Sequence, residues 1–268
     1  MSEHAVTMPA KESSSASGMA WLRRSILAQR TALIVALLGL WELSGLFLFN
    51  PFWSSRPSLI FERIGAMALS GELWRHTSTT LEEAGIGLLL AAVVGIALGI
   101  ALARAPHVAK VVEPVIMGLY GLPRVALAPL FILWFGIGLF SKVMMSFTMV
   151  VFVFILNVVE GVGTIDPDHL DLMHSMRASR FYQVRRVLLP AIVPWILASF
   201  RIGIGLALIG AVVGELIGAN RGLGWYIQDA GGALDTTGVF SGLIVLMAIA
   251  MLANQIVAYV ERKALSWR

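Results

Sequence analysis

Residues 166–194 read DPDHLDLMHSMRASRFYQVRRVLLPAIVP, a charged and amphipathic island in an otherwise apolar chain. Of the 268 residues, 58% are hydrophobic and 13% are charged, whereas a soluble domain carries roughly a quarter charged residues. The apolar stretches on either side of the island are long and continuous, which is typical of membrane-spanning helices and not of the short alternating strands of a transmembrane barrel. The sequence therefore predicts an all-α integral membrane protein.

Five apolar segments have the length, roughly 17–25 residues, that crosses a hydrocarbon core of about 30 Å. They are residues 31–49, 84–103, 143–159, 191–217 and 239–260. A sixth segment, residues 111–134, is interrupted by Glu113, Arg124, Pro114, Pro123 and Pro129. Because irregular backbone at membrane depth is tolerated only where protein or a watery cavity surrounds it, we expect this segment to face the interior of the bundle. The prediction is six transmembrane helices.

The distribution of Lys and Arg predicts the orientation, because cytoplasmic loops carry an excess of both residues. With the N-terminus in the cytoplasm, thirteen of the 20 basic residues lie inside, five lie outside, and Arg124 and Arg201 lie within spans. Both termini and the island are then cytoplasmic. Residues 1–30 are interpreted as an N-terminal tail and residues 31–268 as the membrane domain. Residues 1–20 are rich in Ser and Ala without an apolar run, which predicts a disordered segment and not a cleavable signal.

The segment between the first two spans has apolar residues at helical spacing, namely Leu59, Ile60, Ile64, Met67 and Ala68. It is interpreted either as an external amphipathic helix along the membrane interface or as an amphipathic linker packed on the bundle. The second helix is expected to begin at a capping box from Thr80 to Glu83, or earlier, near Leu73.

The island itself has the pattern of two short helices. Asp166 followed by Pro167 is a good start signal, because the Asp side chain caps free N–H groups and proline suits the first helical position. A second apolar stripe, at Phe181, Val184, Val187 and Leu188, follows a turn near residues 177–179. Such an element is too polar to cross the membrane, and it either lies on lipid headgroups or docks into a groove of another protein.

The island resembles the EAA loop of the membrane subunits of bacterial ABC importers. That pattern is Glu-Ala-Ala, three residues, Gly, nine residues and Ile-x-Leu-Pro, and here residues 171–173 (Asp-Leu-Met) and 187–190 (Val-Leu-Leu-Pro) occupy its two ends. Two further stretches, GLPRVALAPLFILWFGIG at residues 121–138 and RIGIGLALIGAVVGELIGANRGLG at residues 201–224, are similar to the nitrate, sulfonate and taurine branch of these permeases. The resemblance covers roughly residues 59–261.

The resemblance implies a MetI-like type I importer fold, in which the EAA-type coupling loop is residues 161–190. It also implies four partners: a dimer of a separate ATPase subunit, an external solute-binding protein, a second copy of the permease and the bilayer of the bacterial inner membrane. The expected ATPase-coupling residues are Asp168, Asp171, Leu172, His174, Ser175, Arg177, Ala178, Ser179, Arg180 and Arg185. The chain has no GxxxxGK[ST] phosphate loop, so we expect a non-catalytic subunit without a cofactor, and no nucleic-acid partner.

Two residues depart from the family pattern. Arg177 stands at the family glycine and Asp171 at the family glutamate. Glycine supplies a positive φ without steric cost, so Arg177 predicts either a different turn or a strained one.

Polar residues within the spans are candidates for the translocation pathway, because burying them in lipid is costly. Arg124 either attracts an anion in a watery cavity or holds a backbone carbonyl. Arg201 lies too deep for easy snorkelling and either pairs with another helix or faces the pathway, while Glu215 is interpreted as an external gate or a subunit contact. Asn157 and Glu42 are expected to bond to other helices. Phe131 and Trp134 either line a constriction or pack, and Gly95, Gly99, Gly203 and Gly205 are expected at close helix contacts.

Two other classes of protein fit the sequence less well. A secondary transporter usually has an internal repeat and paired intramembrane acids, and neither is seen. A membrane-embedded enzyme needs a nucleophile or metal cluster, yet the five histidines lie in tails or loops. The expected function is therefore that of an importer permease for a small anionic solute, sulfonate-, taurine- or nitrate-like, with ATP hydrolysed by another subunit.

Overall fold

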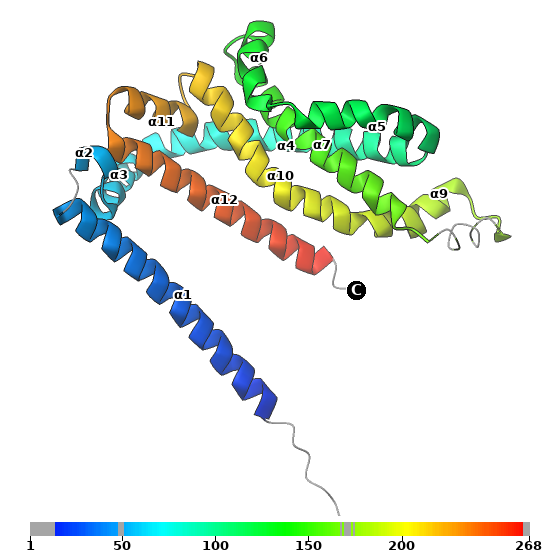
Figure 1. The fold of residues 1–268 in the computed structure, drawn as a ribbon, viewed down its shortest axis with the longest axis horizontal. Helices are drawn as coiled ribbons and strands as arrows, with labels where there is room; N and C mark the ends of the chain where they lie inside the picture. Colours follow the sequence, from blue (N-terminus) through cyan, green and yellow to red (C-terminus); the bar gives the residue numbers. More distant parts are fainter. Residues whose placement is uncertain (1–13, 48–50, 167, 169–172, 174, 265–268) are drawn as a thin grey trace, which may run out of the picture. The chain divides into compact units, whose positions relative to one another are not determined.

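The computed structural model describes residues 14–47, 51–166, 168, 173 and 175–264, and the regular secondary structure among them is helical (Figure 1). Within these ranges, five helices are long and apolar enough to cross a membrane, and a bent pair of shorter helices brings the number to six. The predicted all-α membrane fold is confirmed. Contacts divide the chain into two compact units, Met1–Leu59 and Ile60–Arg268.

The first unit contains α1 (Ser14–Phe47), α2 (Pro51–Ser54) and the first residues of α3 (Pro57–Ser70). The disorder predicted for residues 1–20 is wrong from Ser14 onward, because α1 begins there. Ala, Met and Leu in residues 14–22 favour the helix and lead without a break into the apolar span.

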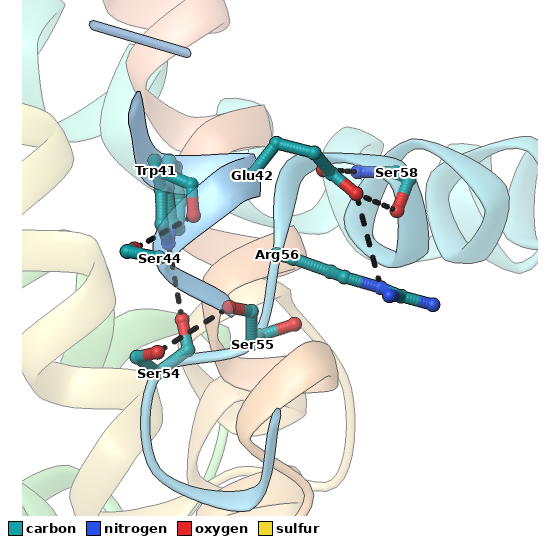
Figure 2. A network of polar contacts seen from close by, with 7 residues as sticks. All are labelled: Trp41, Glu42, Ser44, Ser54, Ser55, Arg56 and Ser58. Atoms are coloured by element: carbon teal, nitrogen blue, oxygen red, sulfur yellow. Dashed lines mark hydrogen bonds and ion pairs between the residues drawn. The ribbon is translucent and has the colours of Figure 1, made fainter. Parts of the chain in front are cut away.

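Glu42 ties α1 to the start of α3 (Figure 2). Its carboxylate accepts hydrogen bonds from the Ser58 backbone N–H at 2.9 Å and the Ser58 hydroxyl at 2.7 Å, and Arg56 Nε lies 3.9 Å away. Ser58 is the second residue of α3, whose first N–H groups have no partner within the helix and attract negative charge. The expectation that Glu42 bonds to another helix is confirmed.

The second unit is a helical bundle around α4 (Glu72–Ala103), α7 (Leu139–Gly163) and α10 (Leu189–Gly218). α7 packs against both other helices, and the core consists of apolar side chains from these three helices and α6 (Ala128–Phe135). Two C-terminal helices, α11 (Leu223–Gly232) and α12 (Thr236–Ala264), pack against each other and against α10. The most buried part of the membrane domain is therefore the middle of α7.

Glycines set the close approach of these helices. A Cβ added at Gly95 would lie 2.5 Å from Phe154 Cβ, and one at Gly99 would lie 2.7 Å from Val158 Cβ, so α4 meets α7 only because both residues lack a side chain. A Cβ added at Gly203 would lie 2.9 Å from Val150 Cγ1, so Gly203 too is at a close contact. The expectation of a close contact is wrong for Gly205, which has open space around it because it points away from the α7 side of α10.

The segment predicted as the third span is broken. α5 (Pro106–Gly121) is followed by a 3₁₀ turn, η1 (Arg124–Leu127), and by α6, with an 82° bend between the two halves. Pro123 causes the break, because it has no N–H and disfavours a helical residue before it. The expected interior location is only half correct: α6 contributes Ala128 and Phe131 to the core, whereas α5 has no buried residue.

The capping box predicted from Thr80 to Glu83 is wrong, and the alternative start near Leu73 is correct. α4 begins at Glu72, after Gly71 with φ of +79°. Thr80 and Glu83 lie inside the helix and are buried, so their side chains serve another purpose.

Candidate functional site

In the predicted coupling loop, a right-handed helix ends at a turn whose residue Arg177 has the left-handed conformation. Arg177 has φ of +50°, and the Ala178 N–H donates to the Met173 carbonyl at 3.0 Å, which is the bond that closes a Schellman motif. Arg177 therefore adopts the left-handed conformation that glycine would take at its position. Of the two alternatives, the strained turn is the one that forms.

A new helix begins directly after this turn. The Ser179 hydroxyl accepts a hydrogen bond from the Tyr182 N–H at 3.3 Å, and the Ser179 carbonyl accepts one from the Gln183 N–H at 3.0 Å. Ser179 is thus the N-cap of α9 (Arg180–Gln183). The Gln183 side chain donates to the Ala178 carbonyl at 3.2 Å, which closes the turn from the other side.

α9 continues into the membrane span without a loop. Residues Val184–Leu188 form a π-helix, η2, in which Leu189 N–H bonds to the Val184 carbonyl, and α10 follows at once. The prediction of a separate second surface helix is wrong. Pro190 directly follows this π-helical turn, and the helix continues through it although its missing N–H removes one helical hydrogen bond.

The residues predicted to couple to the ATPase, where the structure describes them, lie mostly at the surface. Ser175, Arg177, Ser179 and Arg185 are exposed, and Ala178 is half-buried. Asp168 is exposed, and its N–H donates to Asp166 Oδ1 at 3.0 Å, as the start signal predicts. Asp171, Leu172 and His174 lie outside the described residues, and of Arg180 only the backbone is described.

A second polar cluster lies far from this loop, at the N-terminal end of α7 and the C-terminal end of α10. Glu215 is fully buried, accepts a hydrogen bond from the Thr80 hydroxyl at 2.6 Å and accepts another from the Gly224 N–H at 2.5 Å. The Leu223 N–H donates to the same Thr80 oxygen at 2.8 Å. The Gly222 N–H donates to His76 Nδ1 at 3.1 Å. The loop between α10 and α11 is thereby fastened to α4, and the Glu215 side chain is enclosed by its own subunit.

Glu83 and Lys142 complete this polar cluster. Both are buried, and Lys142 packs against Gly214, where an added Cβ would lie 2.9 Å from Lys142 Cγ, directly before Glu215. Lys142 Nζ also donates to the Ile137 and Gly138 carbonyls, at 2.9 and 3.0 Å.

The sequence analysis missed most of this cluster, although its signal is present. His76, Thr80 and Glu83 follow the i, i+4, i+7 spacing that places three side chains on one helical face. A polar stripe at the start of an apolar helix must find polar partners, and here it finds Glu215 and the glycine-rich segment after it.

Arg124 is held in a cage of carbonyls and rings. Its guanidinium donates to the Tyr120 and Met149 carbonyls, both at 2.7 Å, and lies 4.9 Å and 5.3 Å from the ring centres of Tyr120 and Phe152. Tyr120 lies in the last turn of α5, so Arg124 satisfies a carbonyl that the break at Pro123 leaves free. Its role in the pathway stays a prediction.

The remaining pathway candidates have different surroundings. Asn157 donates to the Ser199 hydroxyl at 3.0 Å and so links α7 to α10, as expected of an interhelical bond. Phe131 is 6% exposed and Trp134 is 60% exposed, so only Phe131 belongs to the core. Arg201 is exposed, and it lines a groove between α10 and α12.

The described part of the chain is thus a helical bundle with several apolar helices long enough to cross a membrane, as in a multi-pass membrane protein. The chain belongs to the family described as the binding-protein-dependent transport system inner membrane component, which matches residues 91–266. It is an ABC importer permease, as the motifs predict.

Three relatives illustrate the family. The chain is 31% identical to the putative aliphatic sulfonates transport permease protein SsuC of Bacillus subtilis, over 92% of this chain and 88% of that one. It is 30% identical to the taurine transport system permease protein TauC of Escherichia coli, over 92% and 91%. It is 31% identical to the formylaminopyrimidine transport permease protein ThiX of Halalkalibacterium halodurans, over 92% and 99%.

Solved structures support the fold. A chain of the inward-facing MetNI methionine ABC transporter matches with a TM-score of 0.62 at 16% identity, over 73% of this chain and 97% of that one. A chain of a bacterial ABC transporter for the acidic polysaccharide alginate matches with a TM-score of 0.59 at 17% identity, over 89% and 98%. The predicted MetI-like permease fold is confirmed.

Proposed function

We propose that this chain forms the membrane pathway of an ATP-driven importer for a small organic anion, with a sulfonate as the solute. Two of the three relatives above are named for aliphatic sulfonates and for taurine, which is itself a sulfonate. This sequence relationship over 92% of the chain is the observation that carries the proposal. ATP is hydrolysed by a separate subunit, and an external binding protein delivers the solute.

The coupling loop is the contact for the ATPase. The Schellman turn at Arg177 fixes the angle between the chain before it and α9, and the exposed side chains of Ser175, Arg177 and Arg185 are available to a partner. Because α9 is continuous with α10, movement of the ATPase is transmitted to a spanning helix without a flexible joint. Two copies of the chain enclose the pathway, in the bacterial inner membrane, with both termini and the loop in the cytoplasm.

Uptake into proteoliposomes tests this proposal. The permease, its ATPase and its binding protein are reconstituted together, and uptake of radiolabelled taurine and butanesulfonate is measured with ATP inside. We expect uptake that is lost when the ATPase carries a substitution that prevents hydrolysis. Uptake that persists without a working ATPase would mean a secondary transporter.

Docking of the ATPase is tested separately. Arg180→Glu together with Leu172→Ala is expected to weaken association with the ATPase while membrane insertion continues. Arg104→Gln, a change at an exposed residue between α4 and α5, is the matched control. Co-purification of the double variant with unchanged affinity would remove the coupling role of this loop.

A further inference from the structure

Arg201 is an unpaired cation in the middle of a membrane span. It is the thirteenth residue of α10 and lies about 18 Å along the helix axis from Leu189 and about 25 Å from Gly218. Among the residues that the structure describes, no hydrogen-bond or ion-pair partner of Arg201 is found. A charge at this depth is costly in lipid, so it needs water or an anion.

The groove beside Arg201 supplies room and further donors. It lies between α10 and α12, has a volume of about 930 Å³ and is lined by Arg201, Gln255, Ala258, Tyr259, Glu261 and Arg262. Gln255, Ala258, Tyr259 and Arg262 follow the i, i+3, i+4, i+7 spacing, so they form one face of α12 opposite Arg201. α10 and α12 are in direct contact and run side by side (Figure 1).

The charges of the groove favour an anion. Arg201 and Arg262 are two fixed cations, Gln255 and Tyr259 add neutral hydrogen-bond donors, and Glu261 is the one acid of the lining. The lining therefore has one more formal positive charge than negative. A guanidinium presents a planar fork of donors that matches the oxygens of a sulfonate or phosphate group, and it stays charged inside a membrane protein.

Building on the proposed function, we propose that this groove is an anion site that binds a tetrahedral oxyanion with an organic tail. Arg201 holds the oxyanion at mid-membrane depth, and Arg262 attracts it at the end of α12. The groove lies on the half of the bundle that carries α9 and the coupling loop, since Arg201 is 13 residues after Leu188, the last residue of η2. The same chemistry is offered by a transported sulfonate and by the headgroup of an anionic phospholipid.

A binding experiment with the assembled permease and ATPase tests the site. The complex is placed in phosphatidylcholine nanodiscs, and binding of radiolabelled butanesulfonate is measured by equilibrium dialysis. Parallel nanodiscs contain phosphatidylglycerol, whose retention is measured by native mass spectrometry.

We expect Arg201→Gln to weaken the binding of one of these probes at least about tenfold, since loss of a charge-assisted bond has this size. We expect Arg262→Gln to weaken it several-fold and Arg201→Lys to have an intermediate effect. Arg104→Gln, which changes an exposed cation outside the groove, should bind as the unmodified protein does.

The outcomes separate the two sources of the anion. Loss of butanesulfonate binding in Arg201→Gln assigns the groove to the transported solute, and loss of phosphatidylglycerol alone assigns it to lipid. If neither probe binds, or both bind Arg201→Gln as tightly as the unmodified protein, the groove is not an anion site. If Arg201→Gln does not assemble with the ATPase, the test uses two milder variants. These are Arg201→Lys, which keeps the charge, and Arg262→Gln, which lies at the end of a helix.

Failure of the site is distinguishable from failure of the proposed function. ATP-driven uptake of butanesulfonate by the unmodified complex, together with unchanged binding in Arg201→Gln, overturns the site alone. Absence of ATP-driven uptake of butanesulfonate overturns the sulfonate as the proposed solute, while the dialysis measurement still decides whether the groove binds an oxyanion.

Discussion

Thr80 and Glu215 lie 135 positions apart in the sequence, yet the Thr80 hydroxyl donates a 2.6 Å hydrogen bond to Glu215 Oε1 in a fully buried space. The same carboxylate accepts a hydrogen bond from the Gly224 N–H, so the Glu215 side chain connects α4, α10 and the start of α11. This joint connects the ends of these helices that lie far from the coupling loop.

Removal of that joint is expected to destabilise the bundle. Glu215→Ala leaves the buried Gly224 N–H without its acceptor, which costs about 1–3 kcal/mol, and leaves the Thr80 hydroxyl only its longer bond to the His76 carbonyl at 3.2 Å. We expect a melting temperature several degrees lower, measured by fluorescence-detected size-exclusion chromatography after heating. The control is Glu82→Ala, which removes an exposed acid of α4 and should leave the melting temperature unchanged.

Two glycines of α4 provide a matched test of helix packing. Gly95→Ala forces a methyl group against Phe154 and is expected to lower the stability by about 1–3 kcal/mol. Gly85→Ala meets nothing within 4 Å and is expected to be neutral or to stabilise the helix by up to about 1 kcal/mol. Thermal unfolding of the two variants side by side checks the prediction, and equal melting temperatures would contradict the close approach of α4 and α7.

The strained turn predicts an unusual gain from glycine. Arg177 has φ of +50°, a conformation that costs a residue with a side chain about 1–2 kcal/mol. Arg177→Gly should therefore remove this strain, stabilise the turn in its present form and strengthen ATPase association up to about fivefold. Arg177→Ala removes the charge and keeps the strain, so it separates the two effects when association is measured by surface plasmon resonance. If Arg177→Gly weakens association, the guanidinium itself contacts the ATPase.

Arg124 allows the structural and pathway roles to be separated. Arg124→Leu removes two hydrogen bonds to carbonyls, and we expect the stability to fall by about 3–6 kcal/mol, because bonds to a charged group are worth about 1.5–3 kcal/mol each. Arg124→Lys keeps the charge and should retain one of these bonds. If Arg124→Lys is stable and its KM for butanesulfonate uptake is unchanged, the guanidinium has only a structural role.

The span pattern and the loop motif are predictable from sequence because both depend on local chemistry. Apolar length determines a span, and the spacing from Asp171 to Pro190 identifies the loop before any contact is known. The family glycine that Arg177 replaces leaves a different turn or a strained turn possible, and the structure has the strained one.

The contacts between segments that lie far apart in the sequence could not be predicted from the sequence alone. His76, Thr80 and Glu83 are recognisable as a polar face, but nothing local to α4 indicates that the partner is Glu215, which comes from the other end of the chain. The continuity of α9 with α10 was missed for a related reason. Pro190 favours a helix start, and only the π-helix before it shows that the helix has already begun.

The π-helix at Val184–Leu188 has a consequence for how this permease matches its partner over evolution. A π-helical turn accommodates one residue more than an α-helical turn, and successive residues of an α-helix differ by about 100° around the axis. Deletion of a single residue here would leave the helix unbroken and would rotate α9 by about that angle against α10. The face offered to the ATPase is thus adjustable by one insertion or deletion, without any change inside the membrane.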